Sequence, residues 1–123
     1  MFENTSAARE RHQRFVERVV LSRVVWGLKG AEGWATTTST AAATHGREVL
    51  PFWSDRGFAN ECAKGPWAKY EPKEIPLDLF IQRWLPQMTI EGCLAATNWN
   101  AHLSGHELEP DALRDELARQ SGH

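Results

Sequence analysis

Several kinds of residue and segment are scarce or missing in this sequence. It has two cysteines, Cys62 and Cys93, which do not make a disulfide framework. No apolar run approaches the roughly 20 residues of a membrane-spanning helix, and residues 1–10 lack the charged-then-apolar order of a signal peptide. We find no internal repeat, no low-complexity segment and no linker. These absences predict one reduced, cytoplasmic domain over residues 1–123, with frayed ends at 1–4 and 120–123.

Charge is modest in amount and uneven in distribution. The chain is 41% hydrophobic and 24% charged, as in an ordinary globular protein, and its net charge is −2. Residues 1–30 carry six Lys/Arg against three Glu, whereas the rest of the chain carries eight against thirteen Asp/Glu. A nucleic-acid-binding domain usually has a larger basic excess. We therefore expect a solvated helix face in the first segment, and no nucleic-acid or membrane partner.

The hydrophobic periodicity predicts an α+β fold. Apolar residues at helical spacing predict helices at 4–22, 54–63, 76–85 and from Pro110 onward. Short β-branched, aromatic or small apolar runs predict strands at 24–28, 34–39, 49–53, 93–97 and 106–108, with a further short strand at Ile75. The segments 40–46, 67–74 and 87–92 should be irregular. We expect a mainly antiparallel sheet of about four to six short strands covered by about four helices, with 24–28 and 34–39 forming a hairpin.

The stretch 48–63 is central to this prediction, because it combines a strand, a turn and a helix. Its strand is apolar throughout, so both faces should be covered. Pro51 lacks a ladder donor and favours an edge strand or a bulge. Ser54 is suited to be the helix N-cap, since its hydroxyl can accept a hydrogen bond from the backbone N–H two or three residues later.

Several motifs resemble those of one family of small bacterial proteins. They are Phe52-Trp53-Ser54-Asp55-Arg56, Phe58-Ala59 with Cys62-Ala63, Trp67, Tyr70-Glu71-Pro72, Ile75-Pro76-Leu77-Asp78, Trp84-Leu85-Pro86 and Thr97-Asn98-Trp99-Asn100. The family is known as domain of unknown function 2750, and the resemblance runs from about Phe15 to Leu117. It has no established activity. The resemblance therefore implies a fold and a bacterial source, and nothing catalytic.

A metal site is not indicated by the histidines or cysteines. His102 and His106 are four residues apart, a spacing that presents two imidazoles on one face only within a helix. Ser104 and Gly105 lie between them and disfavour a helix, and no Cys-x-x-Cys accompanies them. We expect surface histidines beside a turn, no metal and no other cofactor.

The candidate nucleophiles have structural explanations. Cys62 lies on the apolar side of an expected helix and Cys93 opens an expected buried strand, so both should be slow to react. Ser54 lacks the Gly-x-Ser-x-Gly surroundings of a hydrolase serine. A set of glycines spaced three residues apart consists of Gly27, Gly30 and Gly33. It lacks the dinucleotide-binding spacing, and we interpret these glycines as turn residues of the hairpin.

Polar and aromatic residues follow two of the expected strands. We name this set the rim, and it consists of Trp53, Asp55, Arg56, Asn98, Trp99 and Asn100. If the ends of strands 49–53 and 93–97 lie near each other, the rim brings two indoles, a carboxylate, a guanidinium and two amides together. Arginine and aromatic residues suit a protein-binding surface. The alternative is that the tryptophans belong to the core and the polar residues cap helices and turns.

We therefore expect a non-enzymatic, protein-binding domain of the bacterial cytoplasm, of which an immunity protein is one version by analogy of size and class. The alternative is an enzyme or small-ligand binder in which Trp53 or Trp99 stacks on a ligand at the rim. A third hypothesis is nucleic-acid binding through the arginines of 9–23. A deep apolar pocket would favour the ligand, and an exposed patch would favour the protein partner. In a binding protein, truncating Asp55, Arg56 or Asn98 should leave folding nearly intact.

Overall fold

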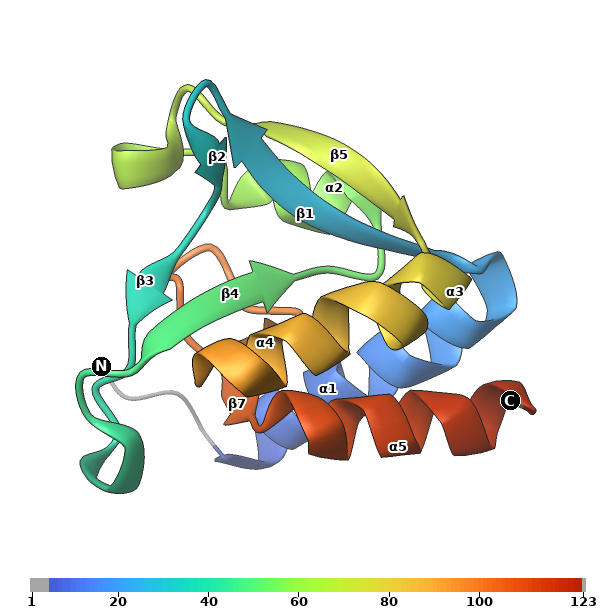
Figure 1. Ribbon diagram of the computed structural model, residues 1–123. Coiled ribbons are helices and arrows are strands. Elements are labelled where there is room, and N and C mark those ends of the chain that lie inside the picture. The colour runs from blue at the N-terminus through green and yellow to red at the C-terminus, as the bar shows by residue number, and fades with distance from the viewer. Residues whose placement is uncertain (1–4, 123) are drawn as a thin grey trace.

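The computed structural model describes residues 5–122 and confirms the α+β class. Figure 1 shows one sheet above another, with most of the helices gathered beside the lower sheet. The helices are α1 (Thr5–Ser22), α2 (Arg56–Glu61), α3 (Leu77–Leu79), α4 (Leu85–Glu91) and α5 (Pro110–Ser121), with a π-helical turn, η3 (Phe80–Trp84), joining α3 to α4. Two short 3-10 turns are η1 (Ala42–Thr44) and η2 (Gly65–Trp67).

The lower sheet has four strands in the order β3 (Thr37–Thr38), β4 (Glu48–Phe52), β6 (Leu94–Thr97) and β7 (His106–Leu108). β4 and β6 run parallel, with Val49 opposite Leu94 and Phe52 opposite Thr97. The other two pairings are antiparallel. The predicted strands at 49–53, 93–97 and 106–108 are therefore confirmed, and the 93–97 strand is central as its small apolar residues indicate.

Pro51 does not place β4 at the edge of the sheet, because β4 has a neighbour on each side. β3 pairs only with Glu48 and Val49, and Trp53 then exchanges hydrogen bonds with Trp26 of the upper sheet. Pro51 precedes Trp53 by two residues, so its backbone nitrogen faces the same side, between these two contacts. No strand needs a hydrogen-bond donor at that point.

The upper sheet has three antiparallel strands in the order β2 (Gly33–Trp34), β1 (Val24–Gly30) and β5 (Glu71–Pro76). The hairpin of β1 and β2 is confirmed, but the expected strand 34–39 is divided, since Thr37 and Thr38 pair with β4 in the lower sheet. The segment 67–74, expected to be irregular, contains most of β5. Its prolines are tolerated because β5 is an edge strand.

The third helix does not end at Pro86, and the segment 87–92 is helical up to Glu91. A proline inside a helix lacks a donor and its ring clashes with the carbonyl four residues earlier. The π-helical turn η3 ends two residues before Pro86 and includes Gln82, whose carbonyl is the one four residues earlier, so the helix is wider where that clash would occur. Gly92, with φ +76°, then ends the helix in the left-handed conformation that glycine favours.

Gly27 and Gly30 lie in β1 and are not turn residues, which corrects the interpretation from spacing. A Cβ at Gly27 would lie 2.9 Å from two ring carbons of Trp34, and one at Gly30 would lie 3.0 Å from the Tyr70 ring. Both glycines therefore let an aromatic ring pack directly on the strand.

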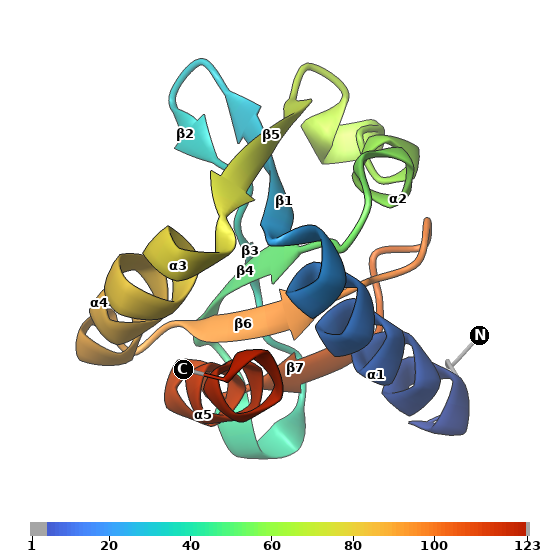
Figure 2. The same cartoon turned by 90° about the vertical axis from the view of Figure 1, so that its right-hand side faces the viewer.

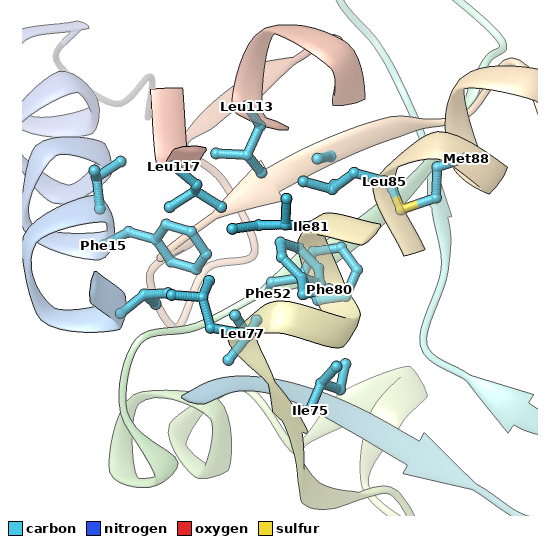
Figure 3. Packing of buried hydrophobic residues seen from close by; sticks show 14 of the residues in the cluster. Phe15, Phe52, Ile75, Leu77, Phe80, Ile81, Leu85, Met88, Leu113 and Leu117 are labelled. Carbon is cyan, nitrogen blue, oxygen red and sulfur yellow. The ribbon is translucent and has the colours of Figure 1, made fainter. Parts of the chain in front are cut away.

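Both faces of β4 and β6 are covered by a hydrophobic cluster. On one face α1, η3, α4 and α5 enclose a cluster in which the Phe52 and Phe80 rings meet edge to face at 4.8 Å (Figure 3). On the other face, Val49 and Leu94 pack in a cluster with α2 and η2. Alternate residues of each strand point to opposite clusters, which explains why both strands are apolar throughout.

Candidate functional site

The rim forms where the parallel strands β4 and β6 end. Their last residues, Phe52 and Thr97, lie opposite each other, so the segments that follow leave the sheet at the same edge (Figure 2). The Ser54 N–H donates to Asn98 Oδ1 at 2.8 Å, which joins the two segments directly. The two strand ends, whose proximity the sequence left open, therefore lie next to each other. In open α/β sheets this edge is the usual place for ligands.

Asn98 is a buried structural residue of the rim, with 3% of its surface exposed. Its backbone φ is +48°, a left-handed value that asparagine tolerates better than most residues. Besides accepting from the Ser54 N–H, its amide Nδ2 donates to Ser54 Oγ at 3.1 Å and to the Arg11 carbonyl at 3.3 Å. The Arg11 Nε in turn donates to the Asn98 carbonyl at 2.9 Å. Asn98 thus joins α1, β4 and β6, and its truncation should not leave folding intact.

Both tryptophans of the rim also belong to the core. Trp53 is fully buried and Trp99 is 6% exposed. The Trp53 Nε1 donates to the Trp99 carbonyl at 3.1 Å, and the Trp99 Nε1 donates to the His106 carbonyl at 3.2 Å. The indole N–H groups are therefore satisfied inside the protein, and the Trp53 ring has no exposed face on which a ligand could stack.

Ser54 is not the N-cap of α2, which corrects the prediction. The N-cap residue is Asp55, in an extended conformation and without a side-chain capping bond. The Ser54 hydroxyl donates instead to Asp55 Oδ2 at 2.7 Å. Because the Asn98 side chain holds the Ser54 backbone N–H, Ser54 remains part of the strand end and the helix begins two residues later.

Asp55 forms a two-point ion pair with α1. Its carboxylate accepts from Arg18 Nε at 2.7 Å and from Arg18 Nη2 at 2.6 Å. Hydrogen bonding by Arg18 is the largest cause that lowers the pKa of Asp55, and the charges of Arg18 and Arg14 lower it further. Asp55 is therefore ionised at neutral pH and held in a fixed orientation.

A row of arginines on α1 borders the rim, and the sequence did not indicate this placement. Arg11, Arg14 and Arg18 are three and four residues apart, so they share one side of the helix. The spacing of the arginines could have indicated that they form a row. Only the structure shows that the ends of β4 and β6 lie beside this row. Arg56 follows Asp55 at the start of α2, with its guanidinium 5.7 Å from the centre of the Trp26 ring.

The concave features at the rim are small. A cavity of about 180 Å³ is lined by Arg11, Arg14, Phe58, Glu61 and residues 98–101. A shallow depression of about 260 Å³ is lined by Arg18, Leu21, Ser22, Ser54 and Asp55. Leu21, at the edge of this depression, exposes 83% of its surface.

Asn100 stabilises the turn that follows the rim. Its Oδ1 accepts from the His102 N–H at 2.9 Å and from the Ser104 N–H at 3.3 Å. Its backbone carbonyl accepts from the Cys62 thiol at 3.2 Å. Burial raises the pKa of Cys62 to about 11. This thiol is therefore protonated at neutral pH, as expected for a structural cysteine.

A buried histidine cluster lies beside the rim and was missed from the sequence. His12 is 8% exposed, with Nδ1 2.8 Å from Thr97 Oγ1 and Nε2 2.7 Å from Glu116 Oε1. The His106 ring is 4.5 Å away, and burial, followed by the nearby His12, lowers the pKa of His106. The order of hydroxyl, imidazole and carboxylate is that of a hydrolase triad, but Thr97 is 0% exposed and a substrate cannot reach it. Four-residue spacing from Ala8 and Val16 could have indicated that His12 is buried.

The two histidines considered for metal binding have different surroundings. His102 is exposed in a turn, as expected, whereas His106 is half-buried in β7 against His12. Among residues 5–122, no group of three or more His, Cys, Asp and Glu side chains is placed to hold a metal ion. None of the helices that the structure describes is both long and apolar enough to cross a membrane.

The profile of a family described as protein of unknown function (DUF2750) matches residues 12–117. This chain belongs to the DUF2750 family. The family resemblance seen in the sequence motifs is thus confirmed. No curated protein matches the chain. Among solved structures it is similar to one described as "Anabaena Tic22 (protein transport)", with 17% identity and a TM-score of 0.46. That match covers 91% of this chain and 54% of the other, about half of its length.

Proposed function

We propose that this protein is a non-enzymatic, cytoplasmic domain that binds another protein through the exposed part of the rim and the adjoining side of α1. We name this area the basic surface, and it consists of Arg14, Arg18, Leu21, Asp55 and Arg56. An immunity protein is one version of this function, by analogy with other small α+β domains. The buried rim residues hold this surface in place and do not contact the partner.

The observation that carries the proposal is an exposed leucine among arginines. Leu21 exposes 83% of its surface and borders the depression formed with Arg18 and Asp55. A single exposed leucine is ordinary on a protein surface. Next to Arg18, which Asp55 holds in place, however, it sets an apolar side chain beside a guanidinium. The cores of protein interfaces are more apolar than the rest of the surface and are enriched in arginine.

The charge of the basic surface is only partly neutralised within the protein. Asp55 is paired with Arg18. Within residues 5–122, neither Arg14 nor Arg56 forms an ion pair, since Arg14 acts on Asp55 only through its longer-range charge. The uncompensated charge is therefore positive. A complementary partner would present acidic groups here, which speeds association and fixes its orientation.

The small-ligand alternative receives less support from the geometry. The cavity at the rim, about 180 Å³, is smaller than the roughly 300–1,000 Å³ of usual ligand pockets. The Trp53 ring is enclosed in the core. These features favour a surface that meets another surface.

The arginine row also supports a second candidate, nucleic-acid binding. Phosphate contacts would produce affinity that falls linearly on a log–log plot against salt concentration. Fluorescence anisotropy with duplex and single-stranded oligonucleotides tests this. Micromolar or tighter binding with that salt dependence would replace the protein-binding proposal, whereas its absence at low salt supports it.

The protein-binding proposal is tested by quantitative capture from an extract of the source cells. Arg56→Glu and Leu21→Ser should each reduce recovery of a discrete partner by about fivefold or more, because interface hot spots contribute more than about 1 kcal/mol. Arg114→Glu on α5 is the matched control, since Arg114 is exposed and lies outside the basic surface. All three variants should keep the wild-type melting temperature within a few degrees. Equal capture by all three variants would reject the basic surface as the binding site.

A further inference from the structure

A larger groove lies along β7, toward the beginning of α1 and separate from the basic surface. Its volume is about 610 Å³, within the range of functional pockets. It is lined by Ala8, Arg9, Ala41, Ala43, Thr44, Leu94 and the six consecutive residues 104–109. Among the strands that the structure describes, β7 lies at the edge of the lower sheet and pairs only with β6 (Figure 2).

The register of the sheet leaves the backbone N–H and C=O of one residue of β7 facing away from β6. The Asn98 N–H bonds to the Phe52 carbonyl of β4, so the backbone groups of Thr97, one residue earlier, face β7. Thr97 lies opposite His106. Because backbone groups alternate between the two sides of a strand, His106 bonds to β6 and Glu107 points its N–H and C=O outward. The register excludes pairing of these two groups with β6, and within residues 5–122 no hydrogen bond outside the strand pairings reaches either of them.

Unpaired N–H and C=O groups at a sheet edge are a template for another strand. Proteins that bind peptides in this way use the main-chain groups for affinity and pockets beside the strand for alternate side chains. Here the groove supplies an apolar lining beside the edge. Leu94 and Ala8 are its buried members, Ala43 lies in η1, and Ala41 directly precedes η1. This combination fits extended chain better than a helix, whose backbone groups are already paired.

The acidic groups in the groove are satisfied within the protein. The Ser39 hydroxyl donates to Glu107 Oε1 at 2.8 Å. Arg47 donates to both carboxylate oxygens of Glu109, at 2.6 and 2.9 Å. Neither carboxylate therefore requires a cation from a ligand.

The basic group in the groove, in contrast, is uncompensated. Arg9 is exposed and forms no ion pair within residues 5–122. His106 is neutral at pH 7, since burial lowers its pKa below the ordinary value of 6.5. The groove thus favours a ligand that carries a carboxylate near Arg9.

We propose that this groove binds an extended, acid-containing segment of a partner protein, which adds a strand to β7 through the N–H and C=O of Glu107 and places a carboxylate at Arg9. Side chains on one side of the added strand would rest on the Leu94 and alanine lining, and those on the other would face solvent. The groove shares no residue with the basic surface, so the two proposals are tested separately.

The test begins with a displayed library of random eight-residue peptides selected on the full chain. We expect selection of sequences rich in β-branched residues with at least one Asp or Glu. The selected peptides are then synthesised and titrated into isotope-labelled protein. The amide signals of 104–109 should shift, and the Glu107 N–H should exchange more slowly with solvent in the complex.

Two substitutions at one position separate the main chain from the side chain. Glu107→Pro removes the outward N–H without removing a bond to β6, and proline is tolerated at a sheet edge. Glu107→Ala removes the carboxylate but keeps that N–H. We expect Glu107→Pro to weaken peptide binding tenfold or more and Glu107→Ala to change it less than twofold. Arg9→Glu should weaken binding at least fivefold, with Arg114→Glu as the unaffected control.

Thermal melting shows whether each variant folds. If Glu107→Pro does not fold, a second probe tests the proposal on the wild-type protein. That probe is the selected peptide with N-methyl groups at alternate residues, which blocks strand pairing on one side only. One of the two methylation registers should abolish binding while the other preserves it. Three results would each overturn the proposal. The first is equal binding of both methylation registers, and the second is peptide-induced shifts on the basic surface instead of 104–109. The third is sedimentation showing that a second copy of the chain occupies the groove.

Discussion

Replacement of Asn98 should be the most destabilising single change among the polar residues of the rim. Asn98→Ala removes an acceptor from the buried Ser54 N–H and removes two donated hydrogen bonds, to Ser54 Oγ and the Arg11 carbonyl. Net hydrogen bonds contribute about 1 kcal/mol each, and an unsatisfied buried donor costs about 1–3 kcal/mol. Alanine also tolerates the φ of +48° less well than asparagine, by about 1 kcal/mol. We expect a loss of about 3–4 kcal/mol in the free energy of unfolding.

Two further variants separate these contributions. Asn98→Gly loses the same side-chain bonds but accepts the left-handed backbone, so it should be about 1 kcal/mol more stable than Asn98→Ala. Asn98→Asp keeps an acceptor for the Ser54 N–H and should also be less harmful than alanine. Urea denaturation followed by tryptophan fluorescence measures all three against wild type. A loss below about 1 kcal/mol for Asn98→Ala, or no advantage for glycine, would refute the roles assigned to the side chain and the backbone.

Three further outcomes follow from the structure. Burial raises the pKa of Cys62 and Cys93 to about 11, so both thiols should label slowly in the native protein, and complete labelling within minutes at about pH 8 would contradict this. Hydrogen bonding by Arg18 lowers the pKa of Asp55, so the contribution of the ionised Asp55 to stability is complete above about pH 4 and is lost as pH falls through the lowered pKa. Asp55→Asn should therefore make the stability less sensitive to acid. Acid unfolding equal to that of wild type would exclude a stabilising role for this ion pair. Gly27→Ala should cost about 1–3 kcal/mol, because its Cβ would lie 2.9 Å from the Trp34 ring, and an unchanged urea midpoint would show that the ring moves freely.

The parts of the fold that the sequence predicts well depend on local patterns. The first helix ends at Ser22 as expected, and Pro110 begins the last helix. The apolar residues of β6 indicate a strand covered on both sides, which the two hydrophobic clusters confirm. These features follow from periodicity and from proline at a first helical position, which are properties of neighbouring residues.

The parts that the sequence misses depend on contacts between distant residues. Serine is a residue type that commonly caps helices, which is why Ser54 is predicted as the N-cap. In the structure the side chain of Asn98, 44 residues later, accepts a hydrogen bond from the Ser54 backbone N–H and keeps Ser54 at the strand end. Pro86 ends an ordinary helix, but a π-helical turn before it allows the helix to continue. The strand at 34–39 divides because its two ends find partners in different sheets. Each case is a tertiary contact that overrides a local preference.

The candidate site shows the same limit. The sequence identifies the residues after two strands, and parallel pairing of β4 and β6 brings them together. It does not indicate that Arg18 of α1 reaches Asp55, or that the backbone groups of Glu107 point away from β6 toward a groove. Both depend on which side of a strand or helix meets another element, and that is set by the register and the packing of the whole domain.

The sequence left two interpretations of the rim open, a part of the fold and a binding surface. The rim has a buried part that belongs to the fold and an exposed part that we propose as a binding surface. A continuous set of hydrogen bonds runs from Asn98 to Ser54, from Ser54 to Asp55, and from Asp55 to Arg18. This series begins at a buried residue and ends at an exposed guanidinium. Immobilising a long side chain at an interface costs about 0.5–1.5 kcal/mol, and Arg18 is already immobilised in the free protein.

If the basic surface binds a partner, loss of Asp55 has two opposing effects on binding. It removes a negative charge from a surface proposed to bind acidic groups, and it lets the Arg18 side chain move. Exposed charge pairs contribute less than about 1 kcal/mol, so the two effects are similar in size. The buried part of the rim can then serve recognition without touching the partner, because it determines where Arg18 points.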